Sequence, residues 1–357
     1  MNPFPYSNPV SVDDLLDRDG EAEELLRNAE EGSNSRLLAP RRYGKTSLVG
    51  RLLHDAAKVG WATVYVDFFG VLTLSDIAER IEAAYAEQLQ GSLRTWFAGV
   101  RRALRPMLTV GGEPPLLDRL ALPRRLHERD GRRVLVVFDE FQDVLGAQSR
   151  ADAVIRSEIQ HHGDAASYVF AGSHVGMMRE LFADKRRAFY GQAAPVALPP
   201  LSPEDVAEYV AERFAATGRE VGAALGLLLD TAQGHPQRTM LLAHYLWDAT
   251  AAGETATEET WFRAHDRAMS DIQDELRAIW GGLPGGQRRA LVAIAENAGG
   301  LYATARSHGG SRGGAIASAV AALADAGEVA EDSSAATGYR VVDPLLAAWI
   351  LRGRSSG

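Results

Sequence analysis

The segment Leu37–Leu48, LLAPRRYGKTSL, decides the fold, because it matches seven of the eight positions of the phosphate-binding loop pattern G-x-x-x-x-G-K-[ST]. Ala39 stands where the pattern has its first glycine. A short apolar run at residues 36–39 precedes the loop, and residues 46–59 have the apolar spacing of a helix. A strand that leads through such a loop into a helix is the setting that phosphate binding requires. Alanine is excluded at position 39 only if its φ must be positive.

The loop offers several groups that bind phosphate. Backbone N–H groups from Arg42 to Thr46 lie at a helix N-terminus, where unpaired donors and the helix dipole favour an anion. Lys45 is expected to reach the β- and γ-phosphates, and the Thr46 hydroxyl to bind Mg²⁺. The alternative is a strand, a turn and a helix with an exposed lysine. The predicted nucleotide-binding residues of the loop are Pro40, Arg41, Arg42, Tyr43, Gly44, Lys45, Thr46 and Ser47.

A second motif lies at residues 132–145, RRVLVVFDEFQDVL, where five apolar residues lead directly into Asp139 and Glu140. A continuous apolar run of this length predicts a strand buried on both faces, and its carboxyl end is where open α/β sheets bind ligands. We expect Asp139 to hold Mg²⁺ through its water shell and Glu140 to polarise the water that attacks the γ-phosphate. The alternative is a loop that begins with ordinary acidic residues.

Three further strands are predicted at residues 62–69, 166–172 and 195–198. The strand at 166–172 ends at Ser173, a candidate sensor of the attacking water or the γ-phosphate; a serine that opens a loop or caps the next helix fits equally well. Five strands separated by helices predict a parallel, three-layer α/β sheet with right-handed crossovers.

These segments resemble the archaeal-ATPase family of P-loop proteins, within the wider group of AAA+ and signal-transducing STAND ATPases. The similar stretches are APRRYGKTSL, VVFDEFQDVL, VFAGSHVGMMRELFADKRRAFYGQA and GHPQRTMLLAHYLW. The resemblance implies a sheet with strand order 5-1-4-3-2, and Mg-ATP bound between the core and a helical lid. It assigns the magnesium contact to Asp139 and the catalytic carboxylate to Glu140.

The resemblance also implies a domain order. It comprises an N-terminal segment with an acidic helix near the nucleotide (1–34), a P-loop ATPase core (35–200), a helical lid (201–280) and a winged-helix domain (281–357). The acidic helix at residues 15–26 departs from the family, because Asp19 replaces the usual glutamate after Arg18. A plain amphipathic helix is an equal alternative to a contact with the adenine.

Two other family positions leave alternatives open. Gln192 stands where the family often has an arginine, which leaves Arg186 or Arg187 as candidates for an arginine finger toward a neighbouring subunit, and an oligomer as an option. His235 and Pro236, in the sequence GHP, resemble the lid motif through which STAND proteins sense nucleotide. The alternative is a helix–helix turn made by glycine and proline.

The lid and the C-terminal region show helical patterns. Lid helices are predicted at residues 203–217, 222–232 and 237–251, with Ser202 as a cap. Helices at 287–298 and 313–326, followed by a hairpin at 328–342, predict a winged helix. Arg306, Arg312 and Arg340 are candidates for DNA phosphate contacts, but three acidic residues lie on the wing. We therefore favour a protein partner, bound through the lid or winged helix, over DNA.

Composition excludes several classes of protein. The 357 residues include no cysteine, which excludes disulfides, thiolate zinc sites and cysteine nucleophiles. A net charge of -9 argues against a protein whose whole surface binds nucleic acid. The absence of a signal-peptide pattern and of a membrane-spanning run predicts a cytoplasmic protein. A metal site made by His161, His162 and His174 is not expected, and these histidines are predicted to be exposed.

Together these features predict a slow or partner-stimulated ATPase that acts as a molecular switch, with ATP and Mg²⁺ as its ligands. The alternative is a DNA-binding regulator related to origin-recognition ATPases, in which ATP is mainly structural. Phosphorylation of a small molecule has little support, since no second substrate pocket is indicated.

Overall fold

A computed structural model describes residues 1–7, 15–89, 94–95, 97–100, 116–297, 301 and 313–355. The chain forms two compact units. We call Arg18–Ala39 with Lys45–Leu198 the core unit, and Met1–Asp17 with Pro40–Gly44 and Pro199–Gly357 the C-terminal unit. The boundary between the two units therefore crosses the predicted phosphate-binding loop, between Gly44 and Lys45.

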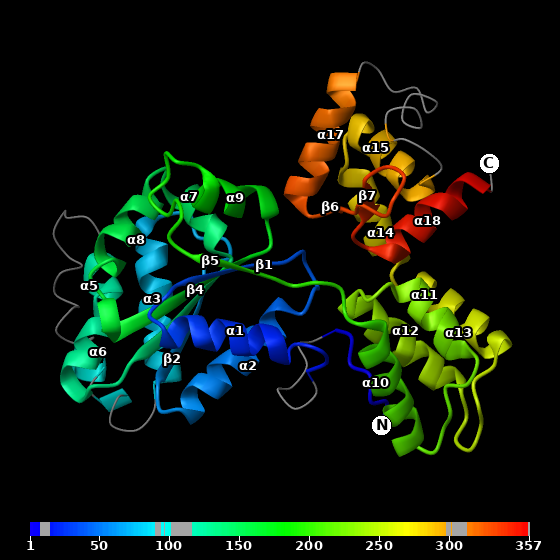
Figure 1. The fold of residues 1–357 in the computed structure, drawn as a ribbon, viewed down its shortest axis with the longest axis horizontal. Coiled ribbons are helices and arrows are strands. Elements are labelled where there is room, and N and C mark those ends of the chain that lie inside the picture. The colour runs from blue at the N-terminus through cyan, green and yellow to red at the C-terminus, as the bar shows by residue number, and fades with distance from the viewer. Residues whose placement is uncertain are drawn as a thin grey trace. The chain divides into compact units, whose positions relative to one another are not determined.

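The core unit contains a five-stranded parallel sheet in the order β2-β3-β4-β1-β5, which confirms the predicted order 5-1-4-3-2 (Figure 1). Every residue of β3 and β4 is buried, as expected of central strands covered on both faces. The strands are β1 (Ser35–Leu38), β2 (Ala62–Asp67), β3 (Val134–Asp139), β4 (Ala166–Gly172) and β5 (Ala194–Ala197).

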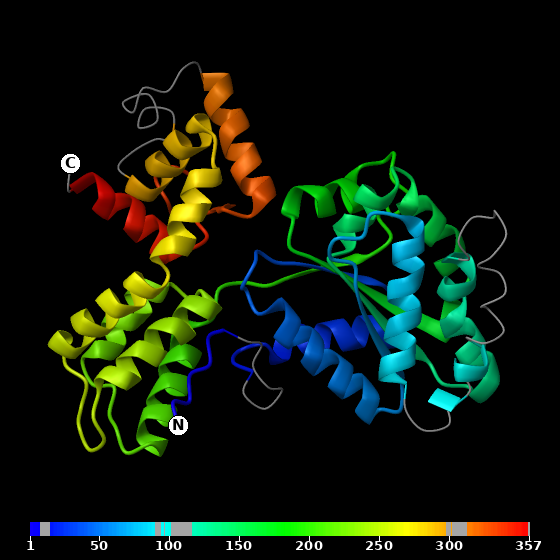
Figure 2. The same ribbon diagram turned by 180° about the vertical axis from the view of Figure 1, so that it is seen from behind.

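Helices cover both faces of this sheet. From β1 the chain moves to β2 at one edge of the sheet, and from β2 it moves back through β3 and β4 toward β5 at the other edge. Right-handed crossovers therefore place the helix after β1 on one face and the later helices on the other. Figures 1 and 2 show these two layers, with α1 and α2 packed together on one side. The helices are α1 (Asp19–Glu30), α2 (Lys45–Lys58), α3 (Leu74–Gln88), α5 (Leu116–Leu120), α6 (Leu122–Asp130), α7 (Val144–Ala147), α8 (Ala151–Ile159) and α9 (Val175–Ala183).

The N-terminal helix and the histidines differ from the sequence expectations. The helix predicted from residue 15 begins at Asp19, whose carboxylate pairs with Arg51 of α2. His162 is buried, which corrects its predicted exposure, because its ring bonds the hydroxyl of Tyr168 in the core. The helix predicted within residues 90–107 lies largely outside the described residues.

The described elements of the C-terminal unit are helices and one hairpin. Its helices are α10 (Pro203–Ala216), α11 (Ala224–Ala232), α12 (Pro236–Ala249), α13 (Glu258–Asp271), α14 (Gln273–Gly282), α15 (Gly285–Glu296), α17 (Gly313–Ala326) and α18 (Pro344–Ser355). Ser202 caps α10 as predicted, since its hydroxyl accepts a hydrogen bond from the Asp205 amide. The predicted hairpin forms from the antiparallel strands β6 (Val329–Glu331) and β7 (Tyr339–Val341). Arg306 and Arg312 lie outside the described residues.

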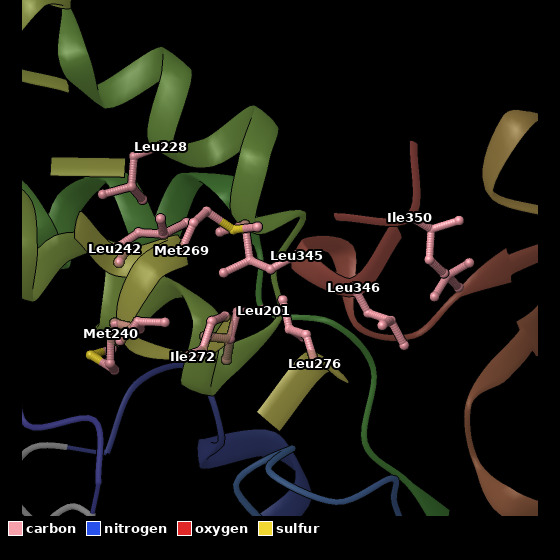
Figure 3. Packing of buried hydrophobic residues seen from close by; sticks show 14 of the residues in the cluster. Leu201, Leu228, Met240, Leu242, Met269, Ile272, Leu276, Leu345, Leu346 and Ile350 are labelled. Atoms are coloured by element: carbon pink, nitrogen blue, oxygen red, sulfur yellow. The ribbon is translucent and has the colours of Figure 1, made fainter. Parts of the chain in front are cut away.

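One hydrophobic cluster runs through the C-terminal unit from α10 to α18. Figure 3 shows part of it, where Leu345 and Leu346 of α18 belong to the same cluster as Leu201, Leu228, Leu242 and Met269. The helices of the predicted lid thus share a core with the last helix of the chain. Within the described ranges, no helix combines the length and the apolarity needed to span a bilayer.

Candidate nucleotide-binding site

The phosphate-loop segment joins β1 to α2, and its two pattern positions, 39 and 44, have different backbone requirements. Ala39 is fully buried, its amide donates to the Gly172 carbonyl at 3.5 Å, and it is not among the residues with positive φ. Gly44 has a φ of 85°, although a Cβ there would meet nothing within 4 Å. Backbone conformation therefore favours glycine at position 44, whereas alanine fits at position 39.

Lys45, at the start of α2, meets both carboxylates at the end of β3. Its Nζ lies 2.6 Å from Asp139 Oδ1 and 2.7 Å from Glu140 Oε1, and its side chain is 9% exposed. The structure thus brings together the three charged groups that the two motifs predict. Because one ammonium faces two carboxylates, phosphate oxygens entering this place would compete with the carboxylates for Lys45.

Glu140 is held by neutral donors as well. Ser173 Oγ donates to Glu140 Oε2 at 2.8 Å, and Gln142 Nε2 donates to the same oxygen at 2.6 Å. Burial by itself would raise the pKa of Glu140, but the bonds from Lys45 and Gln142 outweigh it and lower the pKa to about 2. The residue has a φ of 47°, in the left-handed region that favours glycine. Its carboxylate is therefore ionised and closely oriented.

Ser173 does not cap the next helix. That position belongs to His174, whose Nδ1 accepts a hydrogen bond from the Met177 amide at the start of α9. Ser173 is buried and its hydroxyl faces Glu140, so the geometry favours the sensor interpretation over the capping one.

The residues expected to contact Mg²⁺ provide hard oxygen ligands. Asp139 lies at the end of β3, and Thr46 follows Lys45 with an exposed side chain. Within the described part of the chain, no group of three or more His, Cys, Asp or Glu side chains could form a metal cage. This set fits Mg²⁺, which is usually held by one or two protein oxygens together with nucleotide phosphates and waters.

Tyr43 and His235 come together in the C-terminal unit. Their rings meet edge to face with centroids 5.2 Å apart, and Arg340 Nη2 donates to the Tyr43 hydroxyl at 3.2 Å. Burial lowers the pKa of His235 to about 4, so the ring is neutral at physiological pH and its Nδ1 accepts from the Arg238 amide as the cap of α12.

The GHP motif also has a structural explanation. Gly234 has a φ of 69°, and a Cβ there would lie 2.4 Å from the Leu201 carbonyl oxygen. Pro236 begins α12, where its missing N–H costs no hydrogen bond. The turn alone therefore accounts for Gly234 and Pro236, and nucleotide contacts by His235 and Pro236 stay a prediction.

A buried charge cluster, which we call the Arg238 cluster, lies next to this turn. The Arg238 guanidinium is 1% exposed and bonds both carboxylate oxygens of Asp343, through Nε at 3.1 and 3.0 Å. Its Nη2 also donates to Glu275 Oε1 at 2.6 Å, and Glu275 forms a second ion pair with Arg42 of the loop segment. Arg42 has a φ of 66°, again in the left-handed region.

The two arginine-finger candidates differ in their surroundings. Arg186 is 87% exposed and pairs with Asp184. Arg187 is held within the core unit by Glu180 and by the Ser149 carbonyl. Arg186 is thus the freer of the two to reach another chain, and its role as a finger stays a prediction.

Sequence reasoning missed several contacts within each of the two units. Tyr65, which bonds Asp139, lies within a predicted strand and carries no pattern of its own, and Gln142 lies within the second motif. Glu275 and Asp343 are distant in sequence from the loop. For Gln142, the signal was its spacing of two residues from Glu140.

No protein-family model and no curated protein sequence matches the chain. Solved structures match along its whole length. The Walker-type ATPase paby2304 of Pyrococcus abyssi has a TM-score of 0.74 and 18% identity, covering 98% of this chain and 99% of that one. The Aeropyrum pernix ORC2 protein, in ADPNP–ADP complexes, has a TM-score of 0.61 and 18% identity, covering 99% and 98%.

A third match is the Aeropyrum pernix ORC1 protein in complex with DNA, with a TM-score of 0.50 and 16% identity over 96% of this chain and 94% of that one. At these identities the likeness concerns the fold. The chain shares the fold of these solved proteins, a Walker-type ATPase and two ORC proteins, and the fold expected from its motifs is confirmed at that level.

Proposed function

We propose that the chain binds Mg-ATP and hydrolyses it to ADP and phosphate, as a slow or partner-stimulated molecular switch. The observation that carries the proposal is the meeting of Lys45, Asp139 and Glu140, with Lys45 Nζ 2.6 and 2.7 Å from the two carboxylates, at the carboxyl end of a parallel sheet. Ligands of open α/β sheets bind at this end. The shared fold with a Walker-type ATPase supports the same function.

Binding would begin with an exchange of partners at Lys45. The β- and γ-phosphates, held by the loop amides from Arg42 to Thr46, would draw the ammonium away from Glu140. Loss of that cation would raise the pKa of Glu140 from its value of about 2 and make the carboxylate a better base. The ion pair with Lys45 thus keeps Glu140 weakly basic.

Hydrolysis would then use the oriented carboxylate. Glu140, held by Ser173 and Gln142, would accept a hydrogen bond from water as the water oxygen attacks the γ-phosphorus. The bond between the γ-phosphorus and the bridging oxygen breaks, ADP leaves, and the water proton passes to the carboxylate or to phosphate. Asp139 and Thr46 would hold Mg²⁺, which neutralises charge on the β- and γ-phosphates.

The decisive experiment compares phosphate release by the purified chain with that of Glu140→Gln, which keeps the size of the side chain. With enzyme in excess over Mg-ATP, even a slow first turnover is visible. We expect the wild type to release phosphate roughly a hundredfold faster or more, while Glu140→Gln still binds ATP and Lys45→Ala loses tight binding. Equal release by the wild type and Glu140→Gln would refute hydrolysis.

We further propose that nucleotide state changes what the lid or the C-terminal helices bind, with a protein partner in the cytoplasm. The ion pair from Arg42 of the loop segment to Glu275 of α14 supports this coupling, because a phosphate near the loop would compete for the same guanidinium. Binding of candidate proteins to the ADP-loaded and ATP-loaded chain tests it, and equal affinity in both states would contradict it.

The second candidate is a DNA-binding regulator in which ATP is mainly structural, favoured by the fold shared with the ORC1 protein in complex with DNA. Arg340 bonds the Tyr43 hydroxyl, and Glu331 and Asp332 add negative charge near it, so we rank this candidate second. It predicts duplex affinity that falls steeply with salt and is lost in Arg312→Ala.

A further inference from the structure

Tyr65 of β2 reaches the end of the neighbouring strand. Its hydroxyl donates to Asp139 Oδ2 at 2.7 Å. In the register of the parallel pair, Tyr65 lies opposite Val137 and Asp67 lies opposite Asp139. Side chains two residues apart on a strand share a face of the sheet, so the phenol and the Asp139 carboxylate lie on the same face. The contact follows from register and does not depend on a flexible loop.

The backbone of Tyr65 is fixed independently of its side chain. β2 is an edge strand, and on its open side the Gln88 amide of α3 pairs with Tyr65. The Tyr65 N–H donates to Gln88 Oε1 at 2.7 Å, and Gln88 Nε2 donates to the Tyr65 carbonyl at 2.7 Å. Two hydrogen bonds to the planar side-chain amide of Gln88 thus pair the backbone of Tyr65 on the open side of β2 and support its position beside β3.

The two oxygens of Asp139 have separate partners. Tyr65 occupies Oδ2, whereas Oδ1 accepts from Lys45 Nζ at 2.6 Å and from the Glu140 amide at 2.9 Å. The Tyr65 hydroxyl is the donor in this contact, because a carboxylate oxygen can only accept. One oxygen is therefore anchored, and the other faces the lysine that is expected to meet the phosphates.

We propose that Tyr65 is a positioning residue for the magnesium site, which anchors Asp139 Oδ2 so that Oδ1 is presented to the cation or its water shell. The inference rests on the proposed function. Mg²⁺ demands near-ideal octahedral geometry, so the orientation of a single carboxylate matters. Partners that orient a metal-binding side chain typically change metal affinity by about 10- to 100-fold when they are removed.

The test compares Tyr65→Phe with Tyr85→Phe. Tyr85 of α3 is a matched control, because it is fully buried in the same unit and its hydroxyl has no hydrogen-bond partner among the described residues. A fluorescent ADP analogue is titrated into each variant at a series of Mg²⁺ concentrations and also in EDTA. These titrations give the Mg²⁺ concentration for half-maximal enhancement of binding and the metal-free nucleotide affinity, and thermal melting reports the stability of the fold.

We expect Tyr65→Phe to raise the half-maximal Mg²⁺ concentration by about tenfold or more, with metal-free affinity as in the wild type and a cooperative melting transition that shows a folded chain. Tyr85→Phe should leave all three unchanged. An unchanged Mg²⁺ dependence in Tyr65→Phe overturns the inference, as does an equal loss of affinity with and without Mg²⁺. If the wild type binds no nucleotide, or binds it without regard to Mg²⁺, the proposed function falls and this inference with it.

Discussion

Replacing Arg238 by methionine should destabilise the C-terminal unit by about 3–5 kcal/mol, the usual cost of removing one partner from a buried ion pair. The guanidinium is 1% exposed and neutralises Asp343, whose side chain is 14% exposed. Methionine fills similar space but leaves that carboxylate buried without a cation. Glu275 is 29% exposed, so water can solvate its carboxylate when the cation is removed. Most of the lost free energy of unfolding therefore comes from Asp343.

The pH dependence has a defined sign. Burial would raise the pKa of Asp343, but the hydrogen bonds and the charge of Arg238 outweigh it and lower the pKa below 3.8. A carboxylate with a lowered pKa contributes stability above its unfolded pKa and loses it as pH falls through the folded pKa. In Arg238→Met, burial acts on Asp343 without its cation and raises the pKa of that carboxyl. The difference between wild type and variant should therefore shrink as pH falls through this raised pKa, before Asp343 of the wild type begins to protonate.

Urea unfolding followed by tryptophan fluorescence measures this difference, because Trp247, Trp261, Trp280 and Trp349 all lie in the C-terminal unit. Arg277→Met on α14 is the control: Arg277 is 57% exposed and pairs with Asp274, which is 96% exposed. A surface pair of this kind is worth about 0–1 kcal/mol. If the two variants lose the same free energy of unfolding, or if the loss in Arg238→Met does not depend on pH, the reasoning about the Arg238 cluster is wrong.

Three further outcomes are expected. Ala39→Gly should leave nucleotide affinity within about threefold, or about 0.7 kcal/mol, because Ala39 does not have positive φ; a tenfold change in a fluorescence titration would contradict this. Ser173→Ala removes one hydrogen bond to the Glu140 carboxylate, so single-turnover phosphate release should slow about tenfold at unchanged ATP affinity; unchanged release would show that Ser173 does not orient Glu140. Because the pKa of Glu140 is lowered from 4.5 to about 2, the contribution of the Glu140–Lys45 pair to stability is complete above about pH 4.5. The difference in melting temperature between wild type and Glu140→Gln should shrink only below that pH, and a change between pH 6 and 8 would contradict this.

The sequence motifs predicted the sheet and the centre of the site because both depend on local patterns. The loop segment, the buried strand before Asp139 and the strand before Ser173 each combine a run of apolar residues with polar residues at a fixed position. In a parallel sheet the carboxyl ends of the strands meet at one edge, so correct strands also bring Lys45, Asp139 and Glu140 together.

Contacts between distant side chains could not be predicted in the same way. The bonds of Arg238 to Asp343 and Glu275 join α12 to the start of α18 and to α14, and periodicity shows only that each helix has a buried face. Tyr65 looked like an ordinary strand residue, since its contact with Asp139 depends on the register of two strands. His162 was expected to be exposed because single-sequence reasoning could not see its partner Tyr168.

The left-handed backbone at Glu140 has a consequence for the evolution of the chain. A non-glycine residue with this φ costs roughly 1 kcal/mol, so glycine at position 140 would relieve strain while it removes the carboxylate. The ion pair of the carboxylate with Lys45 and its bonds from Ser173 and Gln142 offset this relief. A laboratory selection for thermal stability alone should therefore retain Glu140 in spite of its backbone strain.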